Sequence, residues 1–207
     1  GNSGLNPEKF TGLAPRYSQT SATVGTLGYT NIVDGAGSGG DNTSIWLIGW
    51  GDNTIHGIYP KGSTAGLQHE DFGEQTISLG ATMGGARMRA LQERFVWDCG
   101  IALKDWRYVV RIANIDTSDL VANSSPADLT NAMIKAMARV PSLNMVRPAF
   151  YMNRTVFEML DIQRRDDVAS GGGLKYENVD GMNTPMFRGI PIRRCDALTN
   201  AEAHVTT

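Results

Sequence analysis

The stretch from Phe95 to Ile112 reads "FVWDCGIALKDWRYVVRI" and decides the fold that we expect for this chain. Its bulky apolar side chains recur at every second position: Phe95, Trp97, Cys99, Ile101 and Leu103, then Tyr108, Val110 and Ile112. Successive side chains of a strand point to opposite faces, so this period predicts half-buried antiparallel strands. The two runs, Phe95–Leu103 and Trp106–Ile112, are expected to form a long hairpin or to be neighbours in one sheet.

Two further hairpins are predicted upstream. The run "SIWLIGW" (Ser44–Trp50) is short, aromatic and β-branched, which is typical of a buried strand. The turn "GDN" (51–53) predicts that "TIHGIYP" (54–60) returns as its partner strand, because Asp and Asn tolerate tight-turn conformations. Gly84-Gly85 is the expected turn of an extended hairpin from Leu67 to Leu103. Such a hairpin buries little within its own domain and can reach a neighbouring molecule.

The second half of the chain predicts helices. The pattern "SPAD" (125–128), with Ser125 as the cap, begins a helix. Apolar residues then recur at helical spacing until Pro141 ends the run. The segment "RPAFYMN" (147–153) predicts a buried strand whose last residue, Asn153, caps another helix.

The last part of the chain predicts a loop and one strand. We expect a long polar loop over 164–185, followed by a final strand in which Pro191 favours an edge position. Because helices and strands mix without a repeated βαβ unit, the expected fold class is α+β.

The composition is that of a globular protein with little net charge. The chain has 207 residues, 41% of them apolar and 19% charged, with a net charge of −2. This length allows one sizeable core or two lobes that share one. The charge balance argues against a protein that grips nucleic acid over its whole surface. No run approaches the ~18 apolar residues of a membrane span, so no membrane partner is expected. Cys99 and Cys195 lack a metal-binding spacing; we expect two buried free thiols, with a disulfide between them as the alternative.

One glycine-rich stretch matches a nucleotide-binding pattern. In "VDGAGSGGDNTS" (33–44), Gly35, Gly37 and Gly40 have the G-x-G-x-x-G spacing of dinucleotide-binding loops. Such a loop works because it opens a helix, whose first N–H groups face the phosphates. This one leads into the strand predicted at Ser44–Trp50. We therefore interpret it as a flexible connection into a sheet, with a nucleotide site as the alternative.

The histidines do not form a catalytic or metal-binding set. His56 lies on a predicted strand, and His204 lies in a polar tail that we expect to be mobile. His69, Glu70 and Asp71 are adjacent on a strand, so their side chains point to opposite faces and cannot all converge on a metal.

The charged residues around the opening stretch favour structural pairing. Asp98 is expected to be partly buried in a salt bridge with an arginine of a neighbouring strand. One local basic region is predicted from Arg87, Arg89, Arg94, Lys104, Arg107 and Arg111. Glu93, Asp98 and Asp105 are interleaved with it, which favours pairing between strands or subunits over nucleic-acid binding. "QRRDD" (163–167) is expected to be a solvated helix end. No catalytic residue, cofactor-binding residue or metal site is predicted.

Five stretches carry a family resemblance that runs in order over nearly the whole chain: Glu8–Ser18, Asp41–Glu74, Lys104–Asp116, Arg147–Gln163 and Phe187–Leu198. They resemble the major capsid proteins of short-tailed double-stranded DNA bacteriophages. The resemblance implies the Hong Kong 97-type capsid fold. In that fold, residues 1–123 would be a mainly β, peripheral-domain-like region with long hairpins, and residues 124–207 an axial-domain-like α/β region. The two could also form one intertwined unit.

The resemblance also implies the position of this chain within such a protein. Asn153–Gln163 would be an axial-domain helix, and 186–195 would be a core strand of the same domain. The family's N-terminal arm, extended loop and long spine helix are not recognisable before Gly1. We therefore expect a C-terminal portion of a longer capsid protein that lacks those elements.

The implied function is structural. Copies of the full-length protein would form the hexamers and pentamers of an icosahedral shell, with scaffold and portal proteins as partners. Packaged DNA would contact its inner face without sequence specificity. The protein would reside in the phage head, and in the host cytoplasm during assembly. The alternatives are a nucleotide-binding enzyme that uses the Gly35–Gly40 loop and a structural protein of the head–tail junction.

Overall fold

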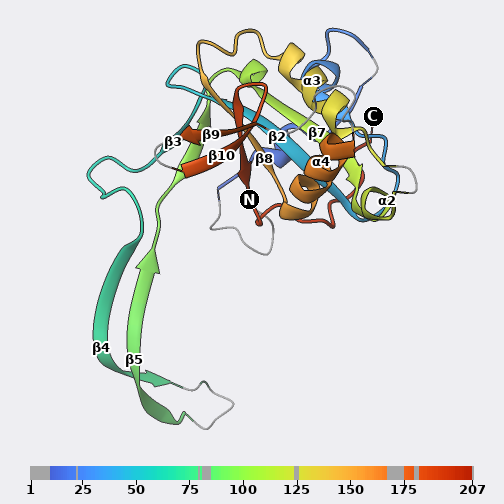
Figure 1. Cartoon of the computed structure of the whole chain (residues 1–207). Coiled ribbons are helices and arrows are strands. Elements are labelled where there is room, and N and C mark those ends of the chain that lie inside the picture. The colour runs from blue at the N-terminus through green and yellow to red at the C-terminus, as the bar shows by residue number, and fades with distance from the viewer. Residues whose placement is uncertain are drawn as a thin grey trace.

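Strands from both halves of the chain form one sheet, from which a two-stranded hairpin projects (Figure 1). The computed structural model describes residues 10–21, 23–78, 80, 85–123, 126–166, 175–179 and 182–206. Within these residues the main sheet has nine strands, seven of which follow the order β1-β7-β2-β8-β11-β10-β9. Their bounds are β1 Ile32–Asp34, β7 Val109–Asp116, β2 Asn42–Trp50, β8 Arg147–Met152, β11 Ile190–Arg194, β10 Met182–Phe187 and β9 Lys175–Val179. The remaining two are β3 (Ile55–Ile58), beside β2, and β6 (Gly100–Leu103), beside β3.

The centre of the sheet is buried on both faces. β2 pairs antiparallel with β7 on one side and with β8 on the other. Ile45 and Leu47 of β2 pack in one apolar cluster, and Trp46 and Ile48 pack in a second cluster on the opposite face. A strand covered on both faces is apolar on both, which is why Ile45–Ile48 does not alternate, while the polar residues Asn42–Ser44 lie at the beginning of the strand.

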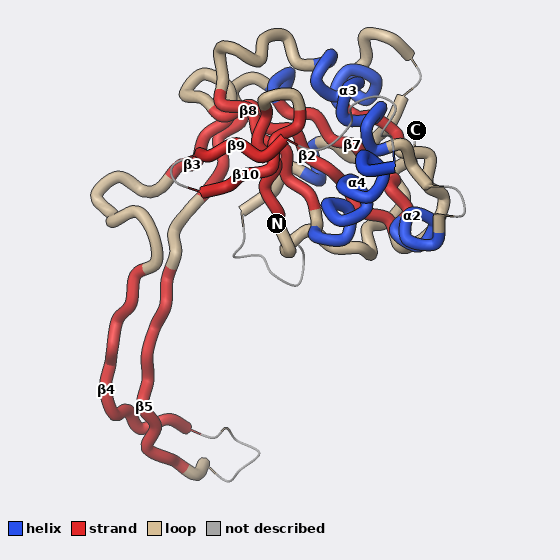
Figure 2. Tube along the Cα trace, viewed as in Figure 1, coloured by secondary structure: helices blue, strands red, loops and turns tan. Residues whose placement is uncertain are grey.

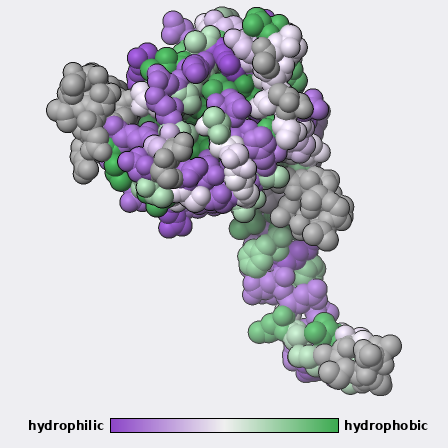
Figure 3. Space-filling view, turned by 90° about the vertical axis from the view of Figure 1, so that its right-hand side faces the viewer, coloured by the Kyte–Doolittle hydropathy of each residue, from purple (hydrophilic) through white to green (hydrophobic). Residues whose placement is uncertain are grey.

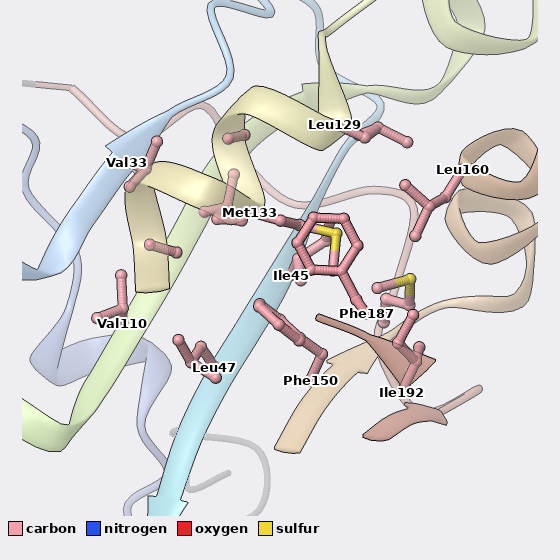
Figure 4. Packing of buried hydrophobic residues seen from close by; sticks show 14 of the residues in the cluster. Val33, Ile45, Leu47, Val110, Leu129, Met133, Phe150, Leu160, Phe187 and Ile192 are labelled. Atoms are coloured by element: carbon pink, nitrogen blue, oxygen red, sulfur yellow. The ribbon is translucent and has the colours of Figure 1, made fainter. Parts of the chain in front are cut away.

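The helices cover one face of the sheet (Figure 2). α3 (Leu129–Arg139) and α4 (Arg154–Asp166) place Met133, Val156 and Leu160 against the sheet. Figure 4 shows these helices over side chains from strands of both halves of the chain, including Leu47, Val110 and Phe150. The shorter helices are α1 (Leu27–Asn31) and α2 (Thr117–Ala122), with single-turn 3-10 helices at Ala14–Arg16 and Trp106–Tyr108.

Two extended segments near the ends of the chain pack on the opposite face. Tyr17 is buried there in an edge-to-face contact with Trp46 at 5.9 Å, and Val205 joins the same cluster. Asn114 holds the end of the chain, because its Oδ1 accepts from the Val205 N–H at 2.8 Å and its Nδ2 donates to the Val205 carbonyl at 2.9 Å. The backbone of Asn114 is left-handed (φ 58°), a conformation that asparagine tolerates well. The tail around His204 is therefore attached to the sheet, contrary to the mobility that we expected.

The two strands predicted from the opening stretch are not neighbours. The first run divides: β5 ends at Val96, and β6 begins at Gly100. The second run begins with a helical turn and continues as β7. β6 pairs with β3, while β7 lies between β1 and β2, so the two runs share the sheet without being paired.

The hairpin predicted at the "GDN" turn is also wrong. β3 meets β2 at a single parallel pair, Trp50–Ile55, and forms its antiparallel ladder with β6. The Thr54 hydroxyl donates to the Gly49 carbonyl at 2.7 Å, which turns the chain away from β2. The side of β2 where a returning strand would lie is taken by β7 or β8, strands that come later in the sequence.

In the second half, the predicted strand at 147–153 and both helices are confirmed, with one change of cap. Asp128 caps α3 by accepting from the Asn131 N–H at 2.9 Å, whereas Ser125 lies outside the described residues. Asn153 caps α4 as expected, accepting from the Thr155 N–H at 3.0 Å. Part of the predicted polar loop is instead ordered as β9 and β10. Pro191 is not on an edge strand, because β11 lies between β8 and β10.

Candidate interaction surface

The most exposed structure in the protein is the hairpin formed by β4 (Gln68–Ser78) and β5 (Arg87–Val96). Its ladder runs from the pair Gln68–Val96 to the pair Ser78–Arg87. Among the described residues each strand pairs only with the other, and Figure 1 shows the hairpin extending well away from the sheet. An extended hairpin is thus confirmed over 68–96 of the predicted Leu67–Leu103. Gly100–Leu103 belongs instead to β6 of the main sheet, and Gly84 of the expected turn lies outside the described residues.

A β-bulge interrupts this ladder. The pairing shifts between Asp71 and Gly73, so that Phe72 is an extra residue on β4. Gly73 has a φ of +66°, and its N–H donates to the Asp71 Oδ1 at 2.8 Å. A bulge of this kind bends the strand and increases its twist, so it sets the direction in which the far half of the hairpin points.

An apolar stripe lies uncovered along the hairpin and its root. It comprises Leu91, Phe95 and Trp97, which are 83%, 60% and 65% exposed. The His69 ring stacks on Phe95 at 4.6 Å, and Figure 3 shows hydrophobic and hydrophilic side chains mixed along the hairpin. The half-buried face predicted for Phe95–Leu103 is therefore not buried within this chain at Phe95 and Trp97, while Ile101 and Leu103 are half-buried against the sheet. Leu91 lies on the same face as Phe95, with Glu93 between them, and was not predicted as part of this surface.

The two strands of the hairpin carry opposite charge. β4 contains Glu70, Asp71 and Glu74 with no lysine or arginine, whereas β5 contains Arg87, Arg89 and Arg94 with one acid, Glu93. The cross-strand ion pairs are Arg89–Glu74 at 3.4 Å, Arg94–Glu70 at 4.0 Å and His69–Glu93 at 3.2 Å. All of these side chains are at least half exposed, so each pair is worth only about 0–1 kcal/mol. Pairing between strands, expected from the interleaved charges, is confirmed.

The predicted basic region does not form one surface. Arg107 lies in the body, where it forms a two-bond pair with Asp105 at 2.8 and 3.0 Å. This pair holds the pKa of Asp105 below its usual value, chiefly through the side-chain hydrogen bond. Asp98 forms no ion pair with any residue that the structure describes, so the salt bridge expected for it is not found. Cys99 is exposed and Cys195 half-buried, both as free thiols, so only the expectation of burial was wrong.

Arg111 belongs to a buried polar network on the sheet face opposite the helices. Its guanidinium donates to the Ser44 hydroxyl at 3.0 Å, to the Tyr17 carbonyl at 2.6 Å and to the Glu202 carboxylate at 2.8 Å. The guanidinium also lies over the Trp46 ring, 5.3 Å from its centroid. The network joins a central strand to segments near both ends of the chain. The pairing of Arg111 with Glu202 was not predicted, because the two residues are 91 positions apart.

The glycine-rich loop is not a phosphate cradle in this structure. It follows β1 and leads into β2, and residues 35–41 contain no helix. The Gly35 N–H donates to the Ala113 carbonyl and the Gly37 N–H to the Asn114 carbonyl, both at 2.8 Å. The loop is therefore bound along β7 and is not the free connection that we expected. A Cβ on Gly37 would lie 2.6 Å from the Asn114 carbonyl oxygen, which explains the need for glycine there.

The remaining candidate residues are dispersed. His56 lines an open groove of about 610 Å³ with Asp52, Met145 and Arg147, but its Nδ1 is buried without a hydrogen-bond partner. A general base needs a partner that orients its ring, and none is present here. The described residues contain no group of three or more His, Cys, Asp or Glu side chains that could hold a metal ion. Within the same residues, no helix has the length and apolar character needed to cross a membrane.

Comparison with known proteins gives a family match and structural matches. A family model described as major capsid protein GP7 matches residues 1–206. A chain in the near-atomic-resolution structure of bacteriophage epsilon15, derived from cryo-EM and modelling, matches with a TM-score of 0.64 and 32% sequence identity. That match covers 100% of this chain and 61% of the epsilon15 chain, so this chain spans less than two thirds of its relative. A comparison with curated proteins found no significant match. The mixed architecture and these matches confirm the expected α+β class and a partial Hong Kong 97-like fold.

Proposed function

Since the chain belongs to the major capsid protein GP7 family, we propose that it is a structural subunit of a bacteriophage head. In the full-length protein, copies would assemble as hexamers and pentamers into an icosahedral shell that encloses double-stranded DNA. The role is mechanical: each subunit holds its neighbours in place and carries out no reaction. The likeness to a chain of bacteriophage epsilon15 supports this proposal.

The observation that carries the proposal is the uncovered β4–β5 hairpin. A two-stranded hairpin alone is marginally stable in water, because neither of its faces is covered. This one leaves Leu91, Phe95 and Trp97 exposed without a partner in the body. Burial of each such side chain contributes about 1.5–3 kcal/mol, so a neighbouring copy that covers the stripe would stabilise both the hairpin and the contact. A self-assembling shell supplies such a copy at every position.

The other partners follow from the family. We propose that scaffold and portal proteins contact the assembling shell in the host cytoplasm, and that packaged DNA contacts its inner face without sequence specificity. The assignment of residues 1–123 to a peripheral-like region and 124–207 to an axial-like region stays a prediction. β2 and β7 of the first range pair with each other and β2 with β8 of the second, which favours the intertwined alternative.

The structure allows the hairpin to be removed cleanly. Ile58 of β3 is paired with Gly100 of β6, so replacing residues 59–99 with Asn-Gly would join these two strands through a tight turn. We expect the full-length gene product to form closed shells under negative-stain electron microscopy. The shortened variant should keep the thermal midpoint of the sheet body and form no shells. Normal shells from the shortened variant would contradict a role for the hairpin.

The same experiment separates the alternatives. Rings or fibres from the full-length protein, in place of closed shells, would favour a head–tail junction protein. An enzyme that uses the Gly35–Gly40 loop would be stabilised by nucleotides, because a ligand that binds the native state raises its stability. We expect no shift of the thermal midpoint with nucleotides at micromolar to millimolar concentrations.

A further inference from the structure

We infer that the hairpins of adjacent copies join edge to edge, with the acidic strand β4 of one copy beside the basic strand β5 of the next. This inference rests on the proposed self-assembly and specifies which surfaces meet. It concerns the outer edges of the two strands, whereas the apolar stripe lies on one face of the hairpin.

Both outer edges of the hairpin are open. β4 and β5 are 11 and 10 residues long, and each has one ladder partner among the described residues. Each strand therefore presents a row of backbone N–H and C=O groups that no strand in the described part of the chain pairs. Natural proteins usually protect such edges, because an exposed edge of this length is a template for pairing with another chain. Addition of a strand to an open edge is also a common way in which proteins bind.

The charges decide which edges can meet. The β4 edge carries Glu70, Asp71 and Glu74, so two β4 edges repel each other. The β5 edge carries Arg87, Arg89 and Arg94 against the single Glu93, so two β5 edges also repel. Opposite charges on adjacent strands stabilise a sheet, and like charges destabilise it. A contact between β4 of one copy and β5 of another is therefore favoured over both contacts between identical strands.

The two outer edges carry opposite charges on each face of the hairpin. From the ladder register, Asp71 and Glu74 lie on the same face as Arg87 and Arg89. On this face the β5 edge also carries Glu93, so its charge is two arginines against one acid. Glu70 and Arg94 form a pair on the other face, which presents one acid on the β4 edge and one arginine on the β5 edge.

The charges are also available to a neighbour. Asp71 and Arg87 form no ion pair with any described residue. The arginine–glutamate pairs within the hairpin are exposed, at 3.4 Å for Arg89–Glu74 and 4.0 Å for Arg94–Glu70. A neighbouring strand therefore meets charges that the hairpin itself does not neutralise.

This pairing has a consequence for symmetry. A contact between two different surfaces runs head to tail, and it forms a ring when its rotation closes. A two-fold contact, by contrast, brings identical surfaces together. The hairpins therefore belong at ring-like contacts in an assembly of copies and are excluded, by their charge, from edge contacts across a two-fold axis.

Charge inversion tests the inference in the full-length gene product. One variant has a basic β4 edge (E70K/D71K/E74K), and the other has an acidic β5 edge (R87E/R89E/R94E). Alone, each variant places like charges on both edges, and we expect the concentration required for shell assembly, measured by sedimentation and electron microscopy, to rise by about tenfold or more. Mixed at equal amounts, they should recover part of the assembly, because β4 of each variant then matches β5 of the other. Every contact is matched in a hexamer in which the two variants alternate, whereas a pentamer keeps at least one contact between like charges. The ion pairs within each hairpin stay broken in the mixture, so the rescue can come only from contacts between copies.

Each outcome is informative. Normal assembly of either inverted variant alone, or failure of the mixture while both variants keep the wild-type thermal midpoint, overturns the edge pairing. The neutral variant E70Q/D71N/E74Q keeps the shape of the hairpin, and its assembly should depend less on salt than that of the wild type; an unchanged salt dependence contradicts the inference. Failure of the wild-type protein itself to form shells would contradict the proposed function, whereas wild-type shells without rescue contradict only the pairing.

Discussion

Replacement of Arg111 by alanine should destabilise the protein more than removal of any exposed charge. Arg111 is on the central strand β7, and its guanidinium contacts the Ser44 hydroxyl, the Tyr17 carbonyl and the Glu202 carboxylate. It also packs over the ring of Trp46. The change therefore removes the link between the sheet and segments near both ends of the chain.

The magnitude follows from burial. The Arg111 side chain is 6% exposed and that of its partner Glu202 is 17% exposed. Removing one member of a buried ion pair leaves the other charge desolvated and unpaired, which costs about 3–5 kcal/mol. With a denaturant slope of about 2–3 kcal/mol per molar for urea, the unfolding midpoint should fall by about 1–2.5 M. The loss of the contact with Trp46 adds to this effect.

Urea unfolding followed by tryptophan fluorescence measures the change, and Arg154→Ala is the matched control. Arg154 pairs with Asp196 at 3.2 Å, but the two side chains are 72% and 60% exposed, so its removal should cost at most about 1 kcal/mol. The double replacement R111M/E202L removes both charges and should recover most of the loss. If Arg111→Ala lowers the midpoint no more than Arg154→Ala, the buried network does not hold the segments together and the reasoning is wrong.

Three further predictions use the same unfolding measurement. Gly37→Ala should lower the free energy of unfolding by about 1–3 kcal/mol, because the new Cβ would lie 2.6 Å from a β7 carbonyl oxygen. Gly40→Ala is the control and should leave stability nearly unchanged, because nothing lies within 4 Å of its Cβ position. Equal effects of the two replacements would contradict the close approach at Gly37. Leu47 is 0% exposed, so Leu47→Ala should lower the free energy of unfolding by about 3–5 kcal/mol. Leu91 is 83% exposed, so Leu91→Ala should lower it by less than about 0.5 kcal/mol and should impair assembly without changing stability. Hydrogen bonds from the first turn of α2 hold the pKa of Asp116 below its usual value, so the stability that they supply is present above pH 4 and is lost as the pH falls through the lowered pKa. Asp116→Asn should reduce the loss of stability at acid pH. If the loss at acid pH is unchanged, other carboxylates are responsible for it.

Local patterns in the sequence predicted those helices and strands that depend on residues close together in the chain. The continuous apolar run at Ser44–Trp50 is a strand because both of its faces are covered, and Asn153 caps a helix with a bond that closes within two residues. The spacing of Leu129 and Met133 placed one face of α3 against the sheet. Each of these signals depends on neighbours within one or two turns, so a single sequence contains them in full.

Pairing between distant segments could not be predicted in this way. The "GDN" turn indicated a hairpin, but β2 found both of its partners more than 50 residues downstream, in β7 and β8. Pro191 suggested an edge strand, yet β11 lies inside the sheet. The pair of Arg111 and Glu202 has no local signal at all. In each case the partner lies far away along the chain, so its identity depends on the whole fold.

The error at Phe95 and Trp97 has a different cause. Alternation of apolar and polar residues predicts that one face of a strand is buried. It does not show whether that face is buried by the same chain or by another molecule. In this structure the body does not cover Phe95 and Trp97. Leu91, which lies on the same face of the hairpin beyond Glu93, is also exposed. Here the sequence pattern predicts burial, but the folded chain leaves the segment exposed. This combination is typical of a surface that contacts another molecule. The disagreement between sequence and structure at these positions therefore supports the proposal that they form a contact surface.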